Sequence, residues 1–403
     1  MKKPQEAMRP SLLMTLVVVL SLLVPLRSQP AIDGPVQDLI NKNSDFATRL
    51  YRALASRTDN NILLSTVSLS HGLSALLGAT SGSSQDQLQQ VLGLAGLDLQ
   101  SFPELFQSMK TVLLGGGALN LKQGVALFPD LSIQVSTSYL DLVQTKYGET
   151  VKSLAYSTPQ EAADTINNWL QQQTGDQVQD LVADLDPQTQ LMLATAALYQ
   201  GRLSQAFNAS VTQDERFFVD KYHVVMVPMM FRADKYFLAY DRSLKVGVLK
   251  LPMVDGAAML VVLPDENVDI NAVEEEVTAE KIQSWIRQLK KTKLEVQLPR
   301  FLLDNSYSLR DVLQTLGMVQ VFQDDADLSN MGAAEGTKLS QVFHKAVLSV
   351  NESGGNDTPG GRSPVFSTPP PRLTINRPFI FVVYHQTSGG VLLMGRLLDP
   401  TKK

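Results

Sequence analysis

The chain has 403 residues, of which 44% are hydrophobic and 19% charged. It can therefore bury a large core and is not a collagen, a coiled coil or a disordered chain. Its 35 Lys and Arg stand against 40 Asp and Glu, which disfavours a broad nucleic-acid-binding face. It has no cysteine, which excludes disulfides, thiolate zinc sites and a cysteine nucleophile.

Residues 1–28 have the pattern of a secretory signal peptide. Basic residues at positions 2, 3 and 9 precede an apolar segment over 12–26, which Pro25 interrupts. The alternative is a transmembrane anchor, but the segment is shorter than the ~20 residues that a bilayer requires. We therefore expect a secreted, extracellular protein with one domain over residues 29–403.

The hydrophobic periodicity then predicts both helices and strands. An amphipathic helix over 36–56 precedes a buried strand over 61–65 and a buried helix over 68–79. Further helices are expected over 160–173, 278–289 and 308–316, and strands over 191–199, 223–229, 246–251, 257–263, 293–298, 379–384 and 391–397. Because the elements do not alternate regularly, an α+β fold is favoured.

The sequence offers little that points to catalysis. The four histidines, at positions 71, 223, 344 and 385, are too scattered for a zinc helix or a local metal cluster. His71 and His344 lie in apolar runs and are expected to be hydrogen-bonded core residues. We expect no catalytic residue, no metal, no cofactor and no enzymatic activity.

Short motifs follow one another in an informative order. They are the segments 61–68 (NILLSTVS), 77–79 (LGA), 166–169 (INNW), 227–230 (VPMM), 298–301 (LPRF), 327–329 (DLS), 344–346 (HKA) and 377–379 (RPF), followed by Gly395, Arg396, Asp399 and Pro400. In this order they resemble the serpin family, from about residue 41 to residue 400. A single match is weak, but the series is specific.

The resemblance implies a single domain of about nine helices and three β-sheets with an exposed reactive-centre loop. That loop should be about 353–371, which overlaps the one low-complexity segment, rich in Gly, Pro, Ser and Thr, over 354–371. In inhibitory members a serine protease cleaves the loop, and its N-terminal half inserts as a central strand of the largest sheet.

The hinge of this loop departs from the inhibitory pattern. Its residues are Glu352, Gly354, Gly355, Asn356, Asp357 and Pro359, where inhibitors carry a Thr-Glu pair and an alanine-rich run. Pro359 cannot donate to a strand ladder and costs ~3 kcal/mol or more in regular structure. Thr66, Thr195 and Leu203 also replace residues that the family usually holds in the sheet. We therefore expect loop insertion to be slow or absent.

This hinge is similar to that of the non-inhibitory branch typified by pigment epithelium-derived factor (clade F). The resemblance implies a secreted signalling factor, anti-angiogenic and neurotrophic, that binds a cell-surface receptor and collagen or a glycosaminoglycan. Residues 285–294 also resemble the protein-Z-dependent inhibitor, so a divergent member of clade A or F is possible. The alternative function is a serine protease inhibitor that acts as a suicide substrate by loop insertion. A third reading, a carrier, would need an apolar surface pocket.

If the chain is an inhibitor, the family spacing locates the scissile region. Counting forward from Glu352 gives about Thr368, and counting backward from Phe379 gives about Ser367. If the count is off by one residue, Phe366 is the specificity residue, whose side chain enters the primary pocket of the protease. An aromatic residue there would favour a chymotrypsin-like target.

Two kinds of surface site are also predicted. The basic cluster Lys281, Arg287, Lys290, Lys291 and Lys293 is a candidate glycosaminoglycan site at a helix end, with a solvated helix end as the alternative. N-glycan acceptor patterns occur at Asn208, Asn351 and Asn356.

Overall fold

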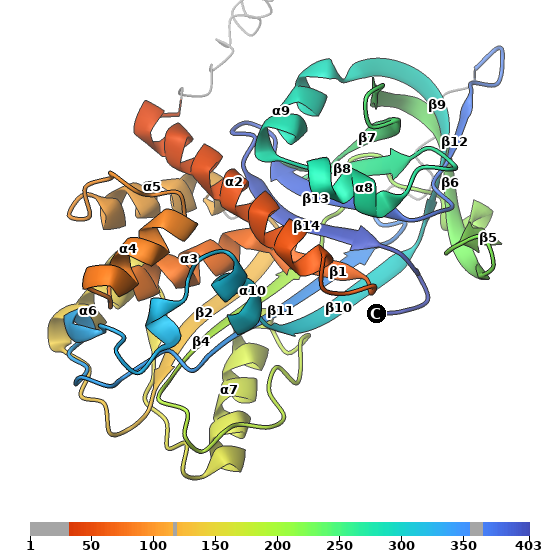
Figure 1. Cartoon of the computed structure of the whole chain (residues 1–403). Helices are drawn as coiled ribbons and strands as arrows, with labels where there is room; N and C mark the ends of the chain where they lie inside the picture. Colours follow the sequence, from red (N-terminus) through yellow and green to blue (C-terminus); the bar gives the residue numbers. More distant parts are fainter. Residues whose placement is uncertain (1–31, 116–118, 355–365) are drawn as a thin grey trace, which may run out of the picture. The chain divides into compact units, whose positions relative to one another are not determined.

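Two β-sheets form the centre of the fold, and helices cover them (Figure 1). The structure is a computed structural model that describes residues 32–115, 119–354 and 366–403. Residues 34–403 form one compact unit. The α+β class that the sequence predicted is confirmed.

The five-stranded sheet has the strand order β10-β11-β4-β2-β3. Its strands are β10 (Phe301–Ser308), β11 (Gln341–Val350), β4 (Leu191–Tyr199), β2 (Leu121–Pro129) and β3 (Thr150–Val151). Strand β4 is buried along its whole length, as expected of a nearly continuous apolar run at the centre of a sheet. It pairs with β2 antiparallel and with β11 parallel.

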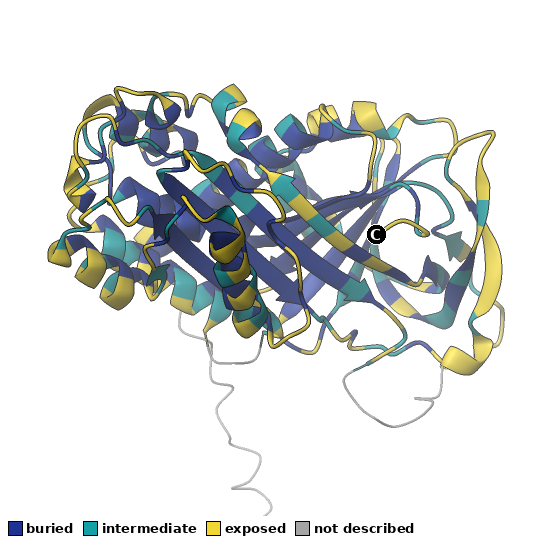
Figure 2. Ribbon diagram, turned by 90° about the horizontal axis from the view of Figure 1, so that it is seen from below, coloured by how far each residue is buried: buried dark blue, intermediate teal, exposed yellow. Residues whose placement is uncertain are grey.

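Helices cover both faces of this sheet. On one face lies α3 (Thr66–Leu77), all of whose residues are buried, and Gly72 lets it come close to Leu193 of β4. On the other face lies α7 (Pro159–Thr174), visible across the dark blue strands in Figure 2. Trp169 of α7 packs edge-to-face on Phe128 of β2, with ring centroids 5.5 Å apart.

The nine-stranded sheet has the order β1-β14-β13-β8-β7-β6-β9-β12, with β5 paired to β6. Its strands are β1 (Ile62–Ser65), β5 (Gln213–Phe218), β6 (Val224–Asp241), β7 (Val246–Pro252), β8 (Ala257–Pro264), β9 (Lys290–Pro299), β12 (Arg372–Thr374), β13 (Phe379–His385) and β14 (Val391–Leu397). The long β6 pairs with β5, then β9, then β7 along its length. Strand β6 therefore joins two regions of this sheet: one contains β5, β9 and β12, and the other contains β7, β8, β13, β14 and β1. These two regions and the five-stranded sheet correspond to the three sheets expected.

Nine α-helices lie in the described part of the chain, as expected. Besides α3 and α7 they are α2 (Gly34–Ala55), α4 (Gly82–Val91), α5 (Phe102–Leu114), α6 (Thr137–Leu142), α8 (Ile270–Glu276), α9 (Ala279–Gln288) and α10 (Arg310–Thr315). A π-helical turn spans Val143–Tyr147, and 3-10 turns span Ala209–Val211, Gln320–Phe322 and Ser329–Met331. None of the helices described has the length and apolar character to cross a membrane.

Candidate functional site

The loop that follows β11 is fastened at its first residues. Thr212 donates a hydrogen bond from Oγ1 to Oε1 of Glu352 over 2.8 Å, and Nη1 of Arg300 lies 3.5 Å from the same oxygen. The Glu352 side chain is largely buried, whereas that of Arg300 is half exposed. The predicted hinge residue Glu352 thus ties the start of the loop to two other segments of the chain.

Two residues later the loop lies against the segment that follows β4. The backbone N–H of Leu203 donates to the carbonyl of Ser353 over 3.3 Å, and Leu203 forms a parallel bridge with Gly354. A Cβ on Gly354 would lie only 2.2 Å from Cβ of Ala206. Glycine is therefore required for this close approach.

The remaining hinge residues, Gly355, Asn356, Asp357 and Pro359, lie outside the described residues. Their expected effect on loop insertion stays a prediction from their chemistry.

The loop begins beside the boundary between β4 and β11, which we call the seam. These strands pair directly and in parallel, from Gln341 opposite Met192 to Leu348 opposite Tyr199. A segment that leaves the end of β11 and turns back runs antiparallel to both strands. If the seam opened, such a segment could hydrogen-bond with β4 on one side and β11 on the other.

The segment between α7 and β4 covers the seam on one face. Leu181 of this segment belongs to the same buried cluster as Ala196 of β4 and Val347 of β11. Nζ of Lys345 in β11 donates to the carbonyl of Asp180 over 3.4 Å. A strand entering the seam has to displace these contacts, so they oppose insertion.

On the opposite face, His344 joins three elements. The backbone N–H of Ser65 donates to its Nε2 over 3.0 Å, and its Nδ1 lies 2.8 Å from Oγ1 of Thr195. Because Nε2 accepts, Nδ1 carries the proton of the neutral ring and donates to Thr195. Burial lowers the pKa of His344 to about 3. His344 is confirmed as a hydrogen-bonded core residue, and Thr195 is its partner.

His71 is also in the core, as expected, but its hydrogen bonding is incomplete. Its Nδ1 lies 3.3 Å from Nε2 of Gln123, while its buried Nε2 has no hydrogen-bond partner among the described residues. His71 is therefore a core histidine that is hydrogen-bonded at Nδ1.

The scissile candidates lie at the C-terminal end of the loop. Phe366 is partly buried, and Nζ of Lys293 lies 5.3 Å from the centroid of its ring, which is a cation–π contact. Ser367 and Thr368 are exposed. The chain then enters β12, which pairs parallel with β9. This stretch is thus accessible and is anchored by β12.

The basic cluster does not form the helix end that the sequence predicted. Helix α9 ends at Gln288, and Leu289 has an extended backbone. Lys290 and Lys291 consequently belong to strand β9, and only Arg287 lies in the last helical turn. The expected helical spacing was wrong because the chain changes from helix to strand at Leu289.

Two lysines of the basic cluster lie on one face of β9, and a third forms an ion pair with an aspartate of another strand. Lys291 and Lys293 are two residues apart in the strand, so their side chains project to the same side, and both are exposed. Lys235 of β6 stands opposite Lys293. Lys281, in contrast, forms an ion pair with Asp241 at 3.1 Å.

Of the predicted glycan acceptors, Asn208 and Asn351 are exposed, and Asn356 lies outside the described residues. Oδ1 of Asn208 accepts hydrogen bonds from the backbone N–H and hydroxyl of Ser210. In the residues described, no group of acidic and histidine side chains could hold a metal ion.

Sequence reasoning missed the partners of the hinge and of the scissile region. Thr212, Ala206 and Lys293 carry no local signal of these roles, because each contacts a residue far away in the sequence. Arg300 occurs in one of the family motifs, but nothing in that motif indicates its pairing with Glu352.

The chain is similar to known proteins over nearly its whole length. The family model described as "Serpin (serine protease inhibitor)" matches residues 41–400. Protein Z-dependent protease inhibitor of Mus musculus is 30% identical over 370 residues, 91% of this chain and 83% of that protein. Leukocyte elastase inhibitor of Bos taurus is 31% identical over 380 residues, 91% of this chain and 100% of that protein.

Solved structures agree with these relatives. The crystal structure of mouse protein Z-dependent protease inhibitor superposes with a TM-score of 0.85 at 29% identity, covering 91% of this chain and 100% of that one. The complex of thyroxine-binding globulin with thyroxine gives a TM-score of 0.83 at 28% identity, covering 91% of this chain and 100% of that one.

These findings correct the predicted function. The relatives named above include two protease inhibitors, so the expectation of a non-inhibitory signalling factor is wrong and the alternative, protease inhibition, fits better. The narrower resemblance to pigment epithelium-derived factor stays unconfirmed. The prediction rested on the hinge composition, on the substitutions at Thr66, Thr195 and Leu203, and on the resemblance of the hinge to the non-inhibitory branch, and these features outweighed the similarity of residues 285–294 to protein-Z-dependent inhibitors.

Proposed function

Because the chain belongs to the serpin family, we propose that it is a secreted inhibitor of serine proteases that acts by inserting its cleaved loop into the seam. The observation that carries this proposal is the direct parallel pairing of β4 with β11, at whose end the loop begins. The segment from Gly354 to Phe366 contains more residues than the nine of β4. It is therefore long enough to fill the seam.

The covalent step uses the chemistry of the protease. Its serine attacks the carbonyl carbon of the specificity residue and forms an ester, and the new amino terminus leaves with a proton. Insertion carries the ester, with the protease attached, along the seam before water hydrolyses it. The loop of this chain therefore supplies a substrate and then a strand.

We take Phe366 as the specificity residue, which makes a chymotrypsin-like enzyme the target. An aromatic side chain suits the hydrophobic primary pocket of such enzymes. The partly buried ring of Phe366 must leave Lys293 to enter that pocket. This contact is weak, about 0.5–1 kcal/mol at an exposed site, so it delays recognition only slightly.

The hinge composition determines how efficient such an inhibitor is. Pro359 and Asp357 lie in the half of the loop that inserts, and both oppose a place inside a sheet. Slow insertion gives water time to hydrolyse the ester. We therefore expect a large fraction of the chains to be cleaved as plain substrate.

The test is to mix the purified chain with chymotrypsin and look for a complex that survives SDS. An inhibitor gives a band at the summed mass, and the separately cleaved chain melts at a higher temperature than the intact one. Chymotrypsin without its nucleophilic serine is the control and should give no such band. Complete cleavage with no complex and an unchanged melting temperature would refute the proposal.

Secretion is proposed from residues 1–28, which lie outside the described residues. Expression in mammalian cells followed by N-terminal sequencing of the secreted chain tests it, with a start near residue 29 expected. Loss of mass on glycosidase treatment, abolished by Asn208→Gln or Asn351→Gln, tests each proposed glycan.

A polyanion site is proposed on the face of β9 that carries Lys291 and Lys293. Two exposed ammonium groups on one side of a strand, with Lys235 opposite, concentrate positive charge locally. Lys291→Ala with Lys293→Ala should lower the salt concentration that elutes the chain from heparin. Lys281→Ala is the matched control, because that ammonium is paired with Asp241; equal losses would contradict the site.

A further inference from the structure

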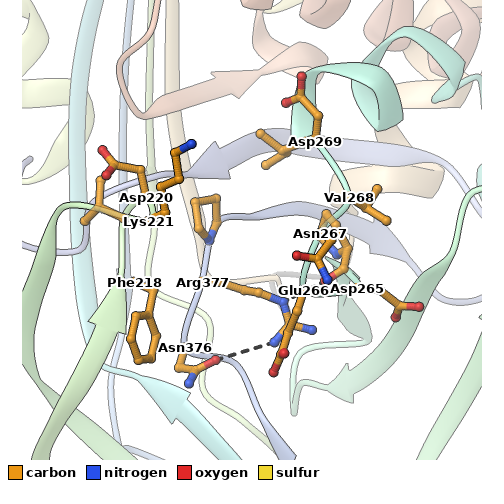
Figure 3. Close-up of a pocket in the computed structure, with 14 residues that line it drawn as sticks. Phe218, Asp220, Lys221, Asp265, Glu266, Asn267, Val268, Asp269, Asn376 and Arg377 are labelled. Carbon is orange, nitrogen blue, oxygen red and sulfur yellow. Dashed lines mark hydrogen bonds between the residues drawn. The ribbon is translucent and has the colours of Figure 1, made fainter.

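A cavity of about 950 Å³ lies on the nine-stranded sheet, away from the loop and the seam. Three segments form it: the turn after β5 (218–221), the connection from β8 to α8 (264–270) and the residues before β13 (376–378) (Figure 3). None of its lining residues belongs to the five-stranded sheet or to residues 351–371. The cavity is therefore separate from the inhibitory machinery.

Apolar side chains form much of its wall. Phe218 ends β5 and is 41% exposed, while its neighbour Phe217 faces the core. The backbone N–H of Phe218 donates to the carbonyl of Asn376 over 2.8 Å. This hydrogen bond joins the end of β5 to the segment 376–378. Pro264 and Val268 line the cavity as well. A ligand with an apolar body would bury these surfaces.

Arg377 supplies an incompletely used cation at this site. Its Nε donates to the carbonyl of Pro264 over 2.7 Å, and Nη1 lies 3.5 Å from Oδ1 of Asn376. No carboxylate in the described part of the chain lies within ion-pair distance of this half-buried guanidinium. Burial lowers its pKa, and the nearby Glu266 and Asp265 raise it. The edge between Nη1 and Nη2 is left with donors for a two-oxygen acceptor.

The carboxylates around the cavity are mostly occupied by local hydrogen bonds. Asp220 accepts from the backbone N–H groups of Tyr222 and His223, Asp265 from the hydroxyl of Tyr240, and Asp269 from the backbone N–H of Asn271. Glu266 is exposed and has no hydrogen bond among the described residues. Of the two carboxylates that act on the Arg377 guanidinium, Glu266 and Asp265, Glu266 is therefore the one without a hydrogen-bond partner in the described part of the chain.

We propose that this cavity binds a small amphipathic carboxylate. The carboxylate pairs with the Nη1–Nη2 edge of Arg377, while the apolar body packs on Phe218, Pro264 and Val268. Glu266 turns away into solvent when the ligand enters. A phosphate or sulfate alone would leave the apolar wall uncovered, so the apolar body is part of the recognition.

The test is calorimetric titration of the intact, protease-free chain with three probes of similar shape. They are 2-naphthoate, the neutral 2-naphthamide and the cationic 2-naphthylmethylamine. We expect 2-naphthoate to bind about tenfold more tightly than the amide, as a charge-assisted pair requires. Arg377→Gln should remove that difference. Phe218→Ala should weaken the binding of 2-naphthoate and 2-naphthamide alike.

A second variant keeps the test decisive if Arg377→Gln fails to fold. Glu266→Gln removes the competing carboxylate and should tighten 2-naphthoate roughly two- to fivefold. Arg216→Gln, an exposed arginine of β5 outside the cavity lining, is the control and should change nothing. No binding of 2-naphthoate, tighter binding of the amine, or weaker 2-naphthoate binding in Glu266→Gln would each overturn the proposal.

Discussion

Gly354 and Ala206 approach so closely that a methyl group on the glycine would lie 2.2 Å from Cβ of Ala206. Real Cβ atoms do not come this near, so Gly354→Ala must push the hinge away from the segment after β4. We expect a loss of about 1–3 kcal/mol in the free energy of unfolding, as for other overpacking changes. Urea unfolding measures it, and hydrogen exchange at 351–354 should accelerate.

Gly247→Ala is the matched control, because the nearest atom to its added Cβ is the carbonyl oxygen of Leu263 at 4.0 Å. This variant should be as stable as the parent or slightly more stable. Equal effects of the two substitutions would show that the hinge does not dock as described.

The second prediction concerns specificity. Phe366→Arg should convert the chain from a ligand of chymotrypsin to a ligand of trypsin, because the trypsin pocket ends in a carboxylate. The rate constants for the two enzymes should shift in opposite directions, each by roughly a hundredfold. Both rate constants follow from the protease activity that remains after timed incubation of each enzyme with the chain. If Ser367→Arg produces the switch and Phe366→Arg does not, the scissile bond lies one residue later.

The third prediction concerns the yield of trapped protease. Pro359→Ala restores a backbone donor and removes a cost of ~3 kcal/mol in regular structure, so insertion should accelerate. The number of chains consumed for each protease trapped should then fall. Pro370→Ala, beyond the scissile region, is the control and should leave this number unchanged. An identical yield in Pro359→Ala would mean that this residue does not enter the sheet.

The fourth prediction is a pH dependence of stability. Burial lowers the pKa of His71 and of His344 to about 3, whereas an unfolded histidine titrates near about 6.5. The unfolded chain therefore binds more protons below pH ~6.5, and the free energy of unfolding falls as the pH drops toward ~3. Each ring contributes on the order of 1 kcal/mol per pH unit.

Glu149 works in the opposite direction. Burial raises its pKa to about 7, so its protonation stabilises the folded chain as the pH falls from ~7 to the unfolded value near ~4.5.

Urea unfolding at about pH 6.5 and about pH 5 tests the contribution of His344. The free energy of unfolding should fall less between these two pH values in His344→Gln than in the parent. If the free energy of unfolding falls equally in the two chains, His344 is protonated in the folded chain.

Strong hydrophobic patterns made much of the fold predictable. The nearly uninterrupted apolar runs over 191–199, 257–263, 379–384 and 391–397 are strands of the two sheets, with bounds within a residue or so of those expected. Helix α4 was missed because Gln, Ser and Asp dominate it and only Ser84, Leu88 and Val91 are buried. Its helical pattern is therefore too sparse to recognise.

The sequence proposes residues for the candidate site but not their contacts. The motif order points to Glu352, and counting points to the stretch from Phe366 to Thr368, whose role as the scissile region stays a prediction. The partners Arg300 and Lys293 could not be predicted, because β9, β10 and the two ends of the loop meet only in the folded chain. No local pattern encodes such a meeting.

The direct pairing of β4 with β11 also bears on how many intact molecules of this protein are needed. If the loop takes the seam after cleavage, that chain cannot return to its starting state and the captured enzyme leaves with it. Capacity then depends on how many fresh molecules are released into the surroundings and how fast spent ones are cleared. Dosage, more than binding strength, would determine how much proteolysis such a protein restrains.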